Sequence, residues 1–471
     1  MVVQHNMQAM NANRMLNITT GAQSKSTEKL SSGYRINRAA DDAAGLTISE
    51  KMRKQIRGLD QASTNAQDGV SSVQTAEGAL TEVHSMLQRM NELAVQASNG
   101  TNADSDRQAI QDEIDQLTTE IDRVAETTKF NEIYLLKGDN SSTKNVYMNG
   151  HDAGLKGTLT DGAKKATFTM DTLEAGDKVT IAGKEYTIGS TKTDAEALLD
   201  KADAAATAAG AGNSVDVEID GTKYTITFKA GGNTIADAVG NTVADLKALK
   251  DKVAAGSKVS YDGNSLTVMN DGNGDGVDDD DSSIITKTVA EQKIVAELTA
   301  ANNVGTVEEK ASVTNDGDAN GKTTYTINKG YATVADTLSF NLHVGADADM
   351  TNKITVDIDT MNSANLGIKG LNVTDATGTA ATYAVDAISD AIAKVSSQRS
   401  ALGAVQNRLE HTIDNLDNIV ENTTTAESRI RDTDMAEEMV NYSKNNILAQ
   451  AGQSMLAQAN QSTQGVLSLL Q

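Results

Sequence analysis

One stretch in the middle of the chain has the residue types and spacing of a calcium-binding loop. Asp271, Asn273 and Asp275 alternate with glycines and match the opening of the D-x-N-x-D-G pattern, in which side-chain oxygens bind Ca²⁺. The twelfth position of such a loop needs a glutamate that binds through both oxygens, and Ser282 stands there instead. Two interpretations stay open: a solvated acidic turn, which the missing glutamate favours, and a weak calcium site.

The rest of the sequence contains no recognisable catalytic motif. The chain has 5 histidines, which are scattered, and no cysteine, so disulfides and thiolate metal sites are excluded. The patterns G-x-S-x-G, Walker A and H-E-x-x-H are absent. We therefore expect no enzyme activity, no cofactor and no metal apart from the weak calcium candidate.

Charge and hydropathy exclude several kinds of partner. A net charge of −24 argues against a nucleic-acid-binding protein and against docking on an anionic membrane surface. No run approaches the roughly 18 apolar residues of a membrane-spanning helix. The first residues lack the charged region, apolar region and cleavage site of a secretory signal. We expect a chain that either stays inside the cell or leaves it without a cleaved signal peptide.

The elements around these motifs are long helices, and the strongest helical pattern runs from 41 to 99. Apolar or small residues recur there in two rows with heptad spacing, which is typical of a helix that packs along its whole length. The rows are Leu59, Ala66, Val73, Leu80, Leu87 and Ala94, and Ala62, Gly69, Ala76, Val83, Met90 and Ala97. At about 1.5 Å per residue this helix would be roughly 85 Å long, so other long helices must cover it.

Two further patterns supply such helices. A stripe that begins after a capping box at Ser105 and Gln108 should fold back antiparallel on the first helix; its residues are Ile110, Ile114, Leu117, Ile121 and Val124. From about 384 a second long seam resumes, through Ile388, Ile392, Val395, Leu402, Leu409, Ile413, Leu416 and Val420. This seam is the expected partner of the one at 41–99.

The last helix, which reaches 471, has an apolar face with nothing in the chain to cover it except a thin helical segment in the first 40 residues. Its face consists of Leu448, Ala451, Met455, Ala459, Ser462, Val466 and Leu470. An exposed apolar stripe of this length indicates an assembly surface.

The middle of the chain changes to strand patterns. Three segments, 179–188, 217–226 and 259–268, each predict two strands joined by a tight turn. Helical stretches are expected after them at about 194–209, 235–255 and 289–301, which gives a repeated ββα-like unit. The predicted fold is therefore mainly α, with long antiparallel coiled-coil-like helices from both termini and a β-rich, α+β inserted region.

Several motifs at both ends of the chain resemble those of bacterial flagellin, the subunit of the flagellar filament. They are LSSGYRIN at 30–37, DDAAG at 41–45, LQR at 87–89, ELAVQ at 92–96, FN at 130–131, LGAVQNRL at 402–409 and SLL at 468–470. The resemblance covers roughly 1–140 and 335–471. It implies a structural protein that polymerises into the bacterial flagellar filament for motility.

The resemblance also implies a domain layout. Terminal helices at 1–42 and 436–471 would form the inner filament core. The helical rod with β-hairpins would take 43–175 and 335–435. A variable, surface-exposed insert with the ββα-like repeats would take 176–334.

The partners implied by the resemblance are other copies of the chain, a flagellar export chaperone at the C-terminal helix, and the filament cap and hook-junction proteins. The location would be the flagellum outside the cell, reached without a cleaved signal peptide. No nucleic acid and no membrane partner are expected.

The family includes ligands of Toll-like receptor 5, an innate immune receptor. By motif, the receptor contacts fall on Arg89, Leu93 and Glu113. The flanking candidates are Gln88, Gln96 and Ile110. Arginine supplies a planar group with several donors, leucine an apolar anchor and glutamate an acceptor. The alternative is that Arg89 and Glu113 are solvated charges on the rod. Arg89 and Leu93 lie off the row of Leu80, Leu87 and Ala94, so we expect them to face outward as candidates for contacts outside the subunit.

Two other functions are compatible with this sequence. A hook–filament junction protein shares the terminal helices, although the dense motifs in both rod segments favour flagellin. A surface adhesin would bind glycans or host protein through the insert, and this role is compatible with filament formation.

Overall fold

The structure is a computed structural model. It describes residues 6–210, 212–229, 232–305 and 307–468, with the side chains of 463–468 excepted. The chain divides into two compact units. The first comprises Met1–Gln74, Ser339–Val356 and Leu402–Gln471, and the second comprises Thr75–Leu338 and Asp357–Ala401. Both units take part of α2 (Ala43–Ala97) and part of α8 (Thr379–Arg431).

The heptad rows of the sequence form the buried face of α2. All eleven apolar members of the two rows are at most 6% exposed, and Gly69 is buried as well. In the first unit Leu59 and Ala62 pack against Leu416 of α8. The prediction of one long helix with a continuous seam, covered by a second long helix near the C-terminus, is confirmed.

A short pair of strands completes the core of the first unit. Strands β18 (Leu338–His343) and β19 (Lys353–Ile358), with the 3-10 helix η1 (Met350–Asn352) before β19, bring Leu342 and Ile354 onto the helices. Gly69 lies against the side chain of Leu342, since a Cβ at this position would stand 2.2 Å from Leu342 Cδ1. A larger residue at this position would therefore force the side chain of Leu342 to move.

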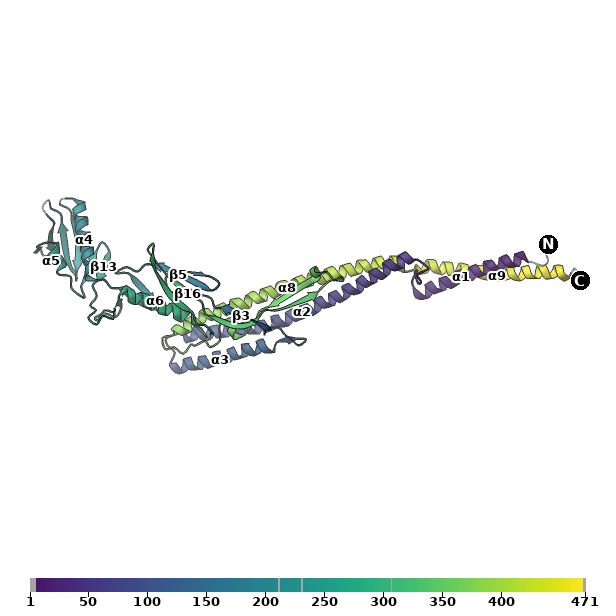
Figure 1. The fold of residues 1–471 in the computed structure, drawn as a ribbon, viewed down its shortest axis with the longest axis horizontal. Helices are drawn as coiled ribbons and strands as arrows, with labels where there is room; N and C mark the ends of the chain where they lie inside the picture. The colour runs from purple at the N-terminus through teal and green to yellow at the C-terminus, as the bar shows by residue number, and fades with distance from the viewer. Residues whose placement is uncertain (1–5, 211, 230–231, 306, 469–471) are drawn as a thin grey trace. The chain divides into compact units, whose positions relative to one another are not determined.

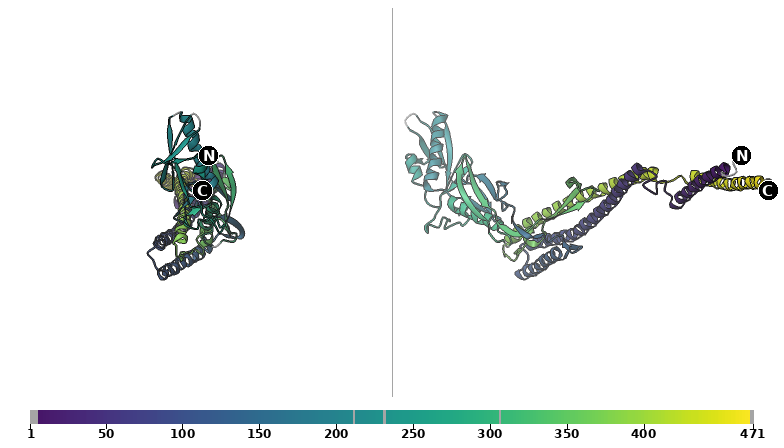
Figure 2. Two further views of the ribbon diagram at one scale, coloured as in Figure 1. Left: turned by 90° about the vertical axis from the view of Figure 1, so that its left-hand side faces the viewer. Right: turned by 45° about the vertical axis from the view of Figure 1, so that its right-hand side comes forward.

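The first unit also pairs the terminal helices α1 (Met7–Ser32) and α9 (Met435–Ser468). They lie side by side and antiparallel (Figures 1 and 2). At the start of α1, Asn6 Nδ2 donates to the carbonyl of Ala459 near the end of α9 at 3.1 Å, and near the end of α1, Lys29 pairs with Glu438 near the start of α9 at 3.7 Å. Pairing of the two terminal segments, which the family resemblance implied, is confirmed for the described residues. Positions 1–5 and 469–471 of those segments, Leu470 among them, lie outside the described residues, as does the side chain of Val466.

Tyr34 joins the chain segments that leave these terminal helices. Its ring lies between the guanidinium groups of Arg53 and Arg431, whose carbons are 5.4 and 4.7 Å from the ring centroid. Arg53 donates to the Tyr34 hydroxyl at 3.1 Å, and the backbone N–H of Arg35 donates to the Arg431 carbonyl at 2.6 Å. The segment between α1 and α2 is thus held against the segment between α8 and α9.

The second unit begins with the C-terminal part of α2 and with α3 (Asp104–Thr127). The predicted stripe of α3 is confirmed: Ile110, Ile114 and Ile121 are buried. The predicted capping box is wrong, because the helix begins before Ser105. The backbone N–H of Ala103 instead donates to the carboxylate of Asp106 at 3.2 Å.

The strands of the second unit, counted over its described residues, form five sheets. The six-stranded sheet has the order β11 (Thr242–Val243), β10 (Thr234–Asp237), β9 (Thr222–Thr227), β8 (Ser214–Ile219), β12 (Lys258–Tyr261) and β13 (Asn264–Thr267). The four-stranded sheet has β15 (Ser312–Ala319), β16 (Lys322–Asn328), β5 (Lys165–Asp171) and β4 (Thr158–Asp161). The three-stranded sheet has β14 (Ile284–Ile285), β7 (Lys184–Ile188) and β6 (Lys178–Ile181). The pairs are β17 (Tyr331–Asp336) with β3 (Asp139–Tyr147), and β1 (Lys129–Phe130) with β2 (Ile133–Tyr134).

Helices pack on the three larger sheets. The apolar face of α4 (Lys192–Ala209), with Leu198 and Leu199, packs on the six-stranded sheet. Ile294 and Leu298 of α6 (Lys287–Ala301) pack on the four- and three-stranded sheets (Figure 1). A mainly helical fold with a strand-rich region inserted into it is therefore confirmed.

All three predicted hairpins form, but the repeat of ββα units is only partly correct. The helices expected after the first and third hairpins are α4 and α6. The helix expected at 235–255 is wrong: the chain there forms β10, β11 and the short α5 (Leu246–Lys250). Ile235 pairs with Ile226 of the neighbouring strand β9. The hydrogen bonds that the segment makes with the edge of β9 outweigh the helical preference of its alanine and leucine residues.

The four-stranded sheet contains residues from both sides of the expected boundary between 43–175 and 176–334. Phe168 of β5 pairs with Tyr325 of β16, and both side chains are fully buried in one core. The division into three domains itself remains a prediction.

A buried leucine of α2 offers a test of the seam. Leu80 is 0% exposed, so Leu80→Ala should lower the free energy of unfolding by about 2–5 kcal/mol. Urea unfolding followed by far-ultraviolet circular dichroism would measure the change. Val95→Ala, on the same helix at 52% exposed, is the control and should change it by no more than about 0.5 kcal/mol. Equal effects of the two variants would contradict the burial of Leu80.

The ion pair between Lys144 and Asp359 predicts a pH dependence. Lys144 Nζ lies 2.7 Å from Asp359 Oδ1. Burial alone would raise the pKa of Asp359, but hydrogen bonds from Lys144 and Thr337 and the charges of Lys144 and Lys394 hold the pKa below its usual value. A carboxylate with a lowered folded pKa adds stability above its unfolded pKa of about 3.9, and this stability is lost as the pH falls through the folded value.

Asp359→Asn should therefore destabilise the protein at pH 7 and have no effect once the pH is well below 3.9. Because the pair is partly exposed, the loss should stay below about 1 kcal/mol. Urea unfolding at a series of pH values would measure it, with Asp357→Asn, an exposed aspartate two residues earlier, as the control. A loss that persists at low pH would show that the charge of Asp359 is not its cause.

Candidate functional site

Arg89 and Glu113 meet on the surface of the second unit. Arg89 Nε of α2 donates to Glu113 Oε1 of α3 at 2.9 Å, and its Nη1 donates to Glu92 Oε2 at 3.2 Å. The side chains are 50%, 44% and 70% exposed, respectively. Arg89 and Glu113, both predicted from the sequence as site residues, are 24 positions apart in the chain and are brought together by the packing of α3 on α2.

The electrostatics of this group keep it charged. The hydrogen bond to Glu113, followed by the one to Glu92, raises the pKa of Arg89. A guanidinium has five N–H donors, and within the described part of the chain two of the three nitrogens of Arg89 donate to a carboxylate. The third nitrogen remains able to donate to a further acceptor.

The flanking glutamines are exposed on the same helix. Gln96 stands seven residues after Arg89, which places the two on one face of α2. Gln88 is exposed and contacts His84 through its side-chain amide at 3.0 Å. The exposed polar part of the predicted site therefore comprises Arg89, Glu113, Gln88 and Gln96, and we call it the α2–α3 surface.

The two apolar residues of the predicted site lie elsewhere. Leu93 is 2% exposed and Ile110 is 6% exposed. The expectation that Leu93 faces outward is wrong for the single chain. Leu93 comes one helical turn after Arg89, and its burial places its side chain in the core and not on the surface.

Glu92 was missed by the sequence interpretation, although a signal for it was present. A glutamate three residues after an arginine on a helix is within ion-pair reach. Arg107 was missed as well. It is 4% exposed and donates to the carbonyls of Ala97, Asn99 and Ala376 at 3.2–3.5 Å, and this capping of the end of α2 has no simple sequence signature.

The acidic turn predicted as a weak calcium site forms hydrogen bonds to its own backbone. Asp271 accepts from the N–H groups of Gly274 and Gly276 at 2.7 and 2.9 Å, and Asp275 accepts from Val277 at 2.8 Å. Within the described ranges no group of three or more His, Cys, Asp or Glu side chains is placed to hold a metal. Calcium binding at Asp271, Asn273 and Asp275 stays a prediction that this geometry does not support.

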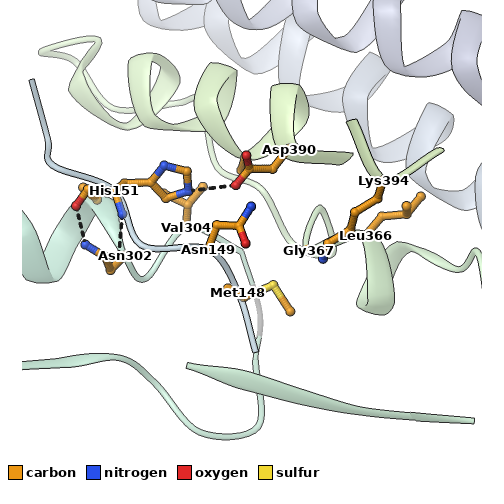
Figure 3. A pocket seen from close by; sticks show the side chains of 11 residues that line it. Met148, Asn149, His151, Asn302, Val304, Leu366, Gly367, Asp390 and Lys394 are labelled. Carbon is orange, nitrogen blue, oxygen red and sulfur yellow. Dashed lines mark hydrogen bonds and ion pairs between the residues drawn. The ribbon is translucent and has the colours of Figure 1, made fainter. Parts of the chain in front are cut away.

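A small cavity in the second unit lies around His151 (Figure 3). The imidazole Nε2 stands 3.4 Å from Asp390 Oδ2, and Asn302 bonds to both the N–H and the carbonyl of His151 at 2.9 Å. Lys394 also lines the cavity, and burial lowers the pKa of its ammonium group. The volume is about 20 Å³, room for roughly one water. This constellation joins α6 to α8 and is too small for a substrate or cofactor.

The terminal pair α1–α9 carries a second candidate surface. Apolar side chains that would normally be buried are exposed here, including Ile18 at 61%, Val440 at 67%, Ile447 at 67% and Leu448 at 47%. Between the helices runs a groove of about 600 Å³, lined by Met15 and Met455. The predicted exposed face of the last helix is confirmed at Leu448 and Met455.

Among the described residues, no helix combines the length and the apolar character needed to cross a membrane.

Both ends of the chain match models of one protein family. The family model described as the bacterial flagellin N-terminal helical region matches residues 3–141, and the bacterial flagellin C-terminal helical region matches residues 385–470. A flagellin of Clostridium tyrobutyricum is 40% identical over 467 residues, which cover 98% of this chain and 100% of that protein. A flagellin of Bacillus subtilis (strain 168) is 35% identical, with 100% of both chains covered. These alignments include the insert, where the sequence motifs showed no resemblance.

Similarity to solved structures is low over the whole chain. FliC from Burkholderia pseudomallei gives a TM-score of 0.26 at 19% identity, covering 72% of this chain and 99% of that one. The flagellar junction protein FlgL from Legionella pneumophila gives 0.32 at 14% identity, covering 82% and 99%. These values carry no argument about function, and the assignment follows from the sequence matches. The chain belongs to the bacterial flagellin family, whose members are structural subunits of the flagellar filament.

Proposed function

We propose that copies of this chain join into the filament through the exposed apolar side chains of α1 and α9. The observation that carries the proposal is their exposure in the single chain, with Ile18, Val440 and Ile447 each more than half exposed. Burial of such a side chain contributes about 1.5–3 kcal/mol. A self-associating partner is favoured because both helices belong to the segments that match the flagellin family models.

The close packing of α1 against α9 supports the proposal that this surface is already formed in the single chain. A Cβ at Gly452 of α9 would stand 3.3 Å from Leu16 Cδ1 of α1, so the absence of a side chain lets the helices approach. Ala449 is 6% exposed in the same interface. The two helices therefore present one joint surface to another copy.

The flagellar partners follow from this assignment as further parts of the proposal. The same apolar face of α9 would be covered by a flagellar export chaperone before assembly. The chain would leave the cell without a cleaved signal peptide and add to a growing filament between the hook-junction proteins and the filament cap. Its place would be the extracellular part of the flagellum.

Polymerisation tests the assembly surface directly. Ile447→Asn should leave the monomer folded, because the side chain is 67% exposed, but should raise the subunit concentration needed for filaments roughly 10- to 100-fold. Sedimentation and electron microscopy of the purified chain would measure this.

Val239→Asn is the matched control for Ile447→Asn, since Val239 is 87% exposed in the strand-rich region. It should not change polymerisation. Unimpaired filament formation by Ile447→Asn, or equal impairment by both variants, would contradict the proposed surface.

We propose as a second function that the α2–α3 surface is recognised by Toll-like receptor 5. The observation that favours it is the exposed Arg89–Glu113 pair with Glu92 and Gln96 beside it. A paired arginine is held in one conformation, which lowers the entropy lost when a receptor binds it. Leu93 and Ile110 would support this surface from beneath.

Receptor signalling tests the assignment. Arg89→Ala should reduce the potency of the monomer in a receptor reporter assay by roughly 10-fold or more, the loss typical of a central interface arginine. Glu113→Ala and Gln96→Ala should give smaller losses. Leu93→Ala is a poor probe, because removal of a buried leucine destabilises the unit by about 2–5 kcal/mol.

The chain offers a matched control for the Arg89–Glu113 pair. Arg123 and Glu120 form another exposed pair, on α3, at 2.5 Å. Arg123→Ala should leave potency unchanged. If Arg89→Ala retains full potency, or if Arg123→Ala loses as much, the receptor site does not lie at Arg89.

A further inference from the structure

The methionines of this chain are distributed unequally between core and surface. The chain has 15 of them, and seven are prominently exposed within the described residues. Six of these seven lie on the terminal helices: Met7, Met10, Met15, Met435, Met439 and Met455, at 48–69% exposure. Met350 is the exception, at 73%.

Exposure is not a general property of methionine in this protein. Met90, Met170 and Met361 are 0%, 7% and 2% exposed and fill the cores of the second unit. Methionine is therefore used as an ordinary core residue away from the terminal helices, whereas on those helices it faces outward.

Two of the exposed methionines line the groove between the terminal helices. Met15 comes from α1 and Met455 from α9, and Gly452 lines the same groove. A methionine side chain is flexible and polarisable, and it adapts to the shape of a partner better than a branched side chain does. These properties suit a surface that must fit against other copies of the chain.

We propose that these six methionines are modification sites, at which oxidation by a peroxide prevents the free subunit from adding to the filament. The inference rests on the proposed role of the α1–α9 surface in joining copies. Subunits already in the filament would be protected, because assembly buries the same side chains.

The chemistry requires one peroxide molecule for each methionine. A lone pair of the thioether sulfur attacks a peroxide oxygen, the S–O bond forms and the O–O bond breaks. Sulfur is oxidised by two electrons to the sulfoxide, the peroxide is reduced, and the second oxygen leaves as water after taking the remaining proton. No further reductant or metal is needed.

The product alters the surface in a defined way. A sulfoxide is polar and accepts hydrogen bonds, whereas the thioether is nearly apolar. Buried between copies without a donor, each sulfoxide should weaken association roughly 10- to 100-fold. Oxidation of two or three of the six residues is then enough to keep the subunit out of the filament.

The test compares the purified full-length chain before and after treatment with hydrogen peroxide. Peptide mass spectrometry should find an added oxygen on the six terminal-helix methionines and on Met350, and none on Met90 or Met361. Sedimentation and electron microscopy should show filaments from the untreated chain and at least a 10-fold reduction after treatment. Filaments treated after assembly should acquire less sulfoxide at the six positions.

Two variants separate the terminal methionines from other effects of peroxide. Replacement of all six by leucine conserves volume, so it should preserve polymerisation and make it resistant to peroxide. Met350→Leu is the matched control and should give no resistance. Reduction of the oxidised wild-type chain by the two methionine sulfoxide reductases, one for each sulfoxide epimer, should restore polymerisation without any substitution.

The outcomes distinguish this inference from the proposed function. If the untreated chain forms filaments and the oxidised chain forms them equally well, the inference is wrong and the assembly surface stands. If the leucine variant remains sensitive to peroxide, or if the reductases restore nothing, the inference is wrong as well. If the untreated wild-type chain forms no filaments, the proposed function fails and the inference fails with it.

Discussion

Burial of one face of α2 is the constraint on which both units of the structure depend. The chain has no cysteine and no proline, and aromatic residues make up only 3% of it, so neither disulfides nor a large aromatic core stabilises it. Small and branched aliphatic side chains must supply the apolar contacts, and they do so along both heptad rows of α2. Since these rows must face α8 and the strands, the remaining faces of α2 carry the polar side chains available to partners.

The terminal helices differ from α2 in that many of their apolar side chains are exposed. In α1 and α9 many large apolar residues face outward, while the contacts between the helices include polar groups such as Lys29 with Glu438 and small residues such as Gly452 and Ala449. Helices of this kind gain little from each other, because most of their apolar surface stays in water. Their stability improves when other copies cover that surface, which links their folding to assembly.

The sequence alone could establish elements that depend on local pattern. Heptad rows predict α2 and α8, and the Asp220-Gly221 and Asp262-Gly263 pairs predict hairpin turns, since the aspartates adopt positive φ angles of 49° and 50°. The sequence alone could not establish features that depend on contacts with another element of the fold. Ile235 enters a strand because β9 offers it hydrogen bonds, and Leu93 is buried although it lies outside the two heptad rows of α2. The pairing of Arg89 with Glu113 likewise depends on how α3 folds back.

The Arg89–Glu113 pair would restrict how the proposed receptor binds this surface. A partner carboxylate that competed for Nε would have to displace Glu113 and leave that carboxylate without its cation, which cancels part of the gain. A partner that approaches the unengaged nitrogen of Arg89 keeps the existing pair and adds to it. The ion pair thus acts as a positioning element: Glu113 and Glu92 orient the guanidinium, and its remaining donors determine the direction from which an acceptor can bind. Recognition would then depend on α2 and α3 being correctly packed, with Leu93 and Ile110 contributing through the core that holds the two helices together.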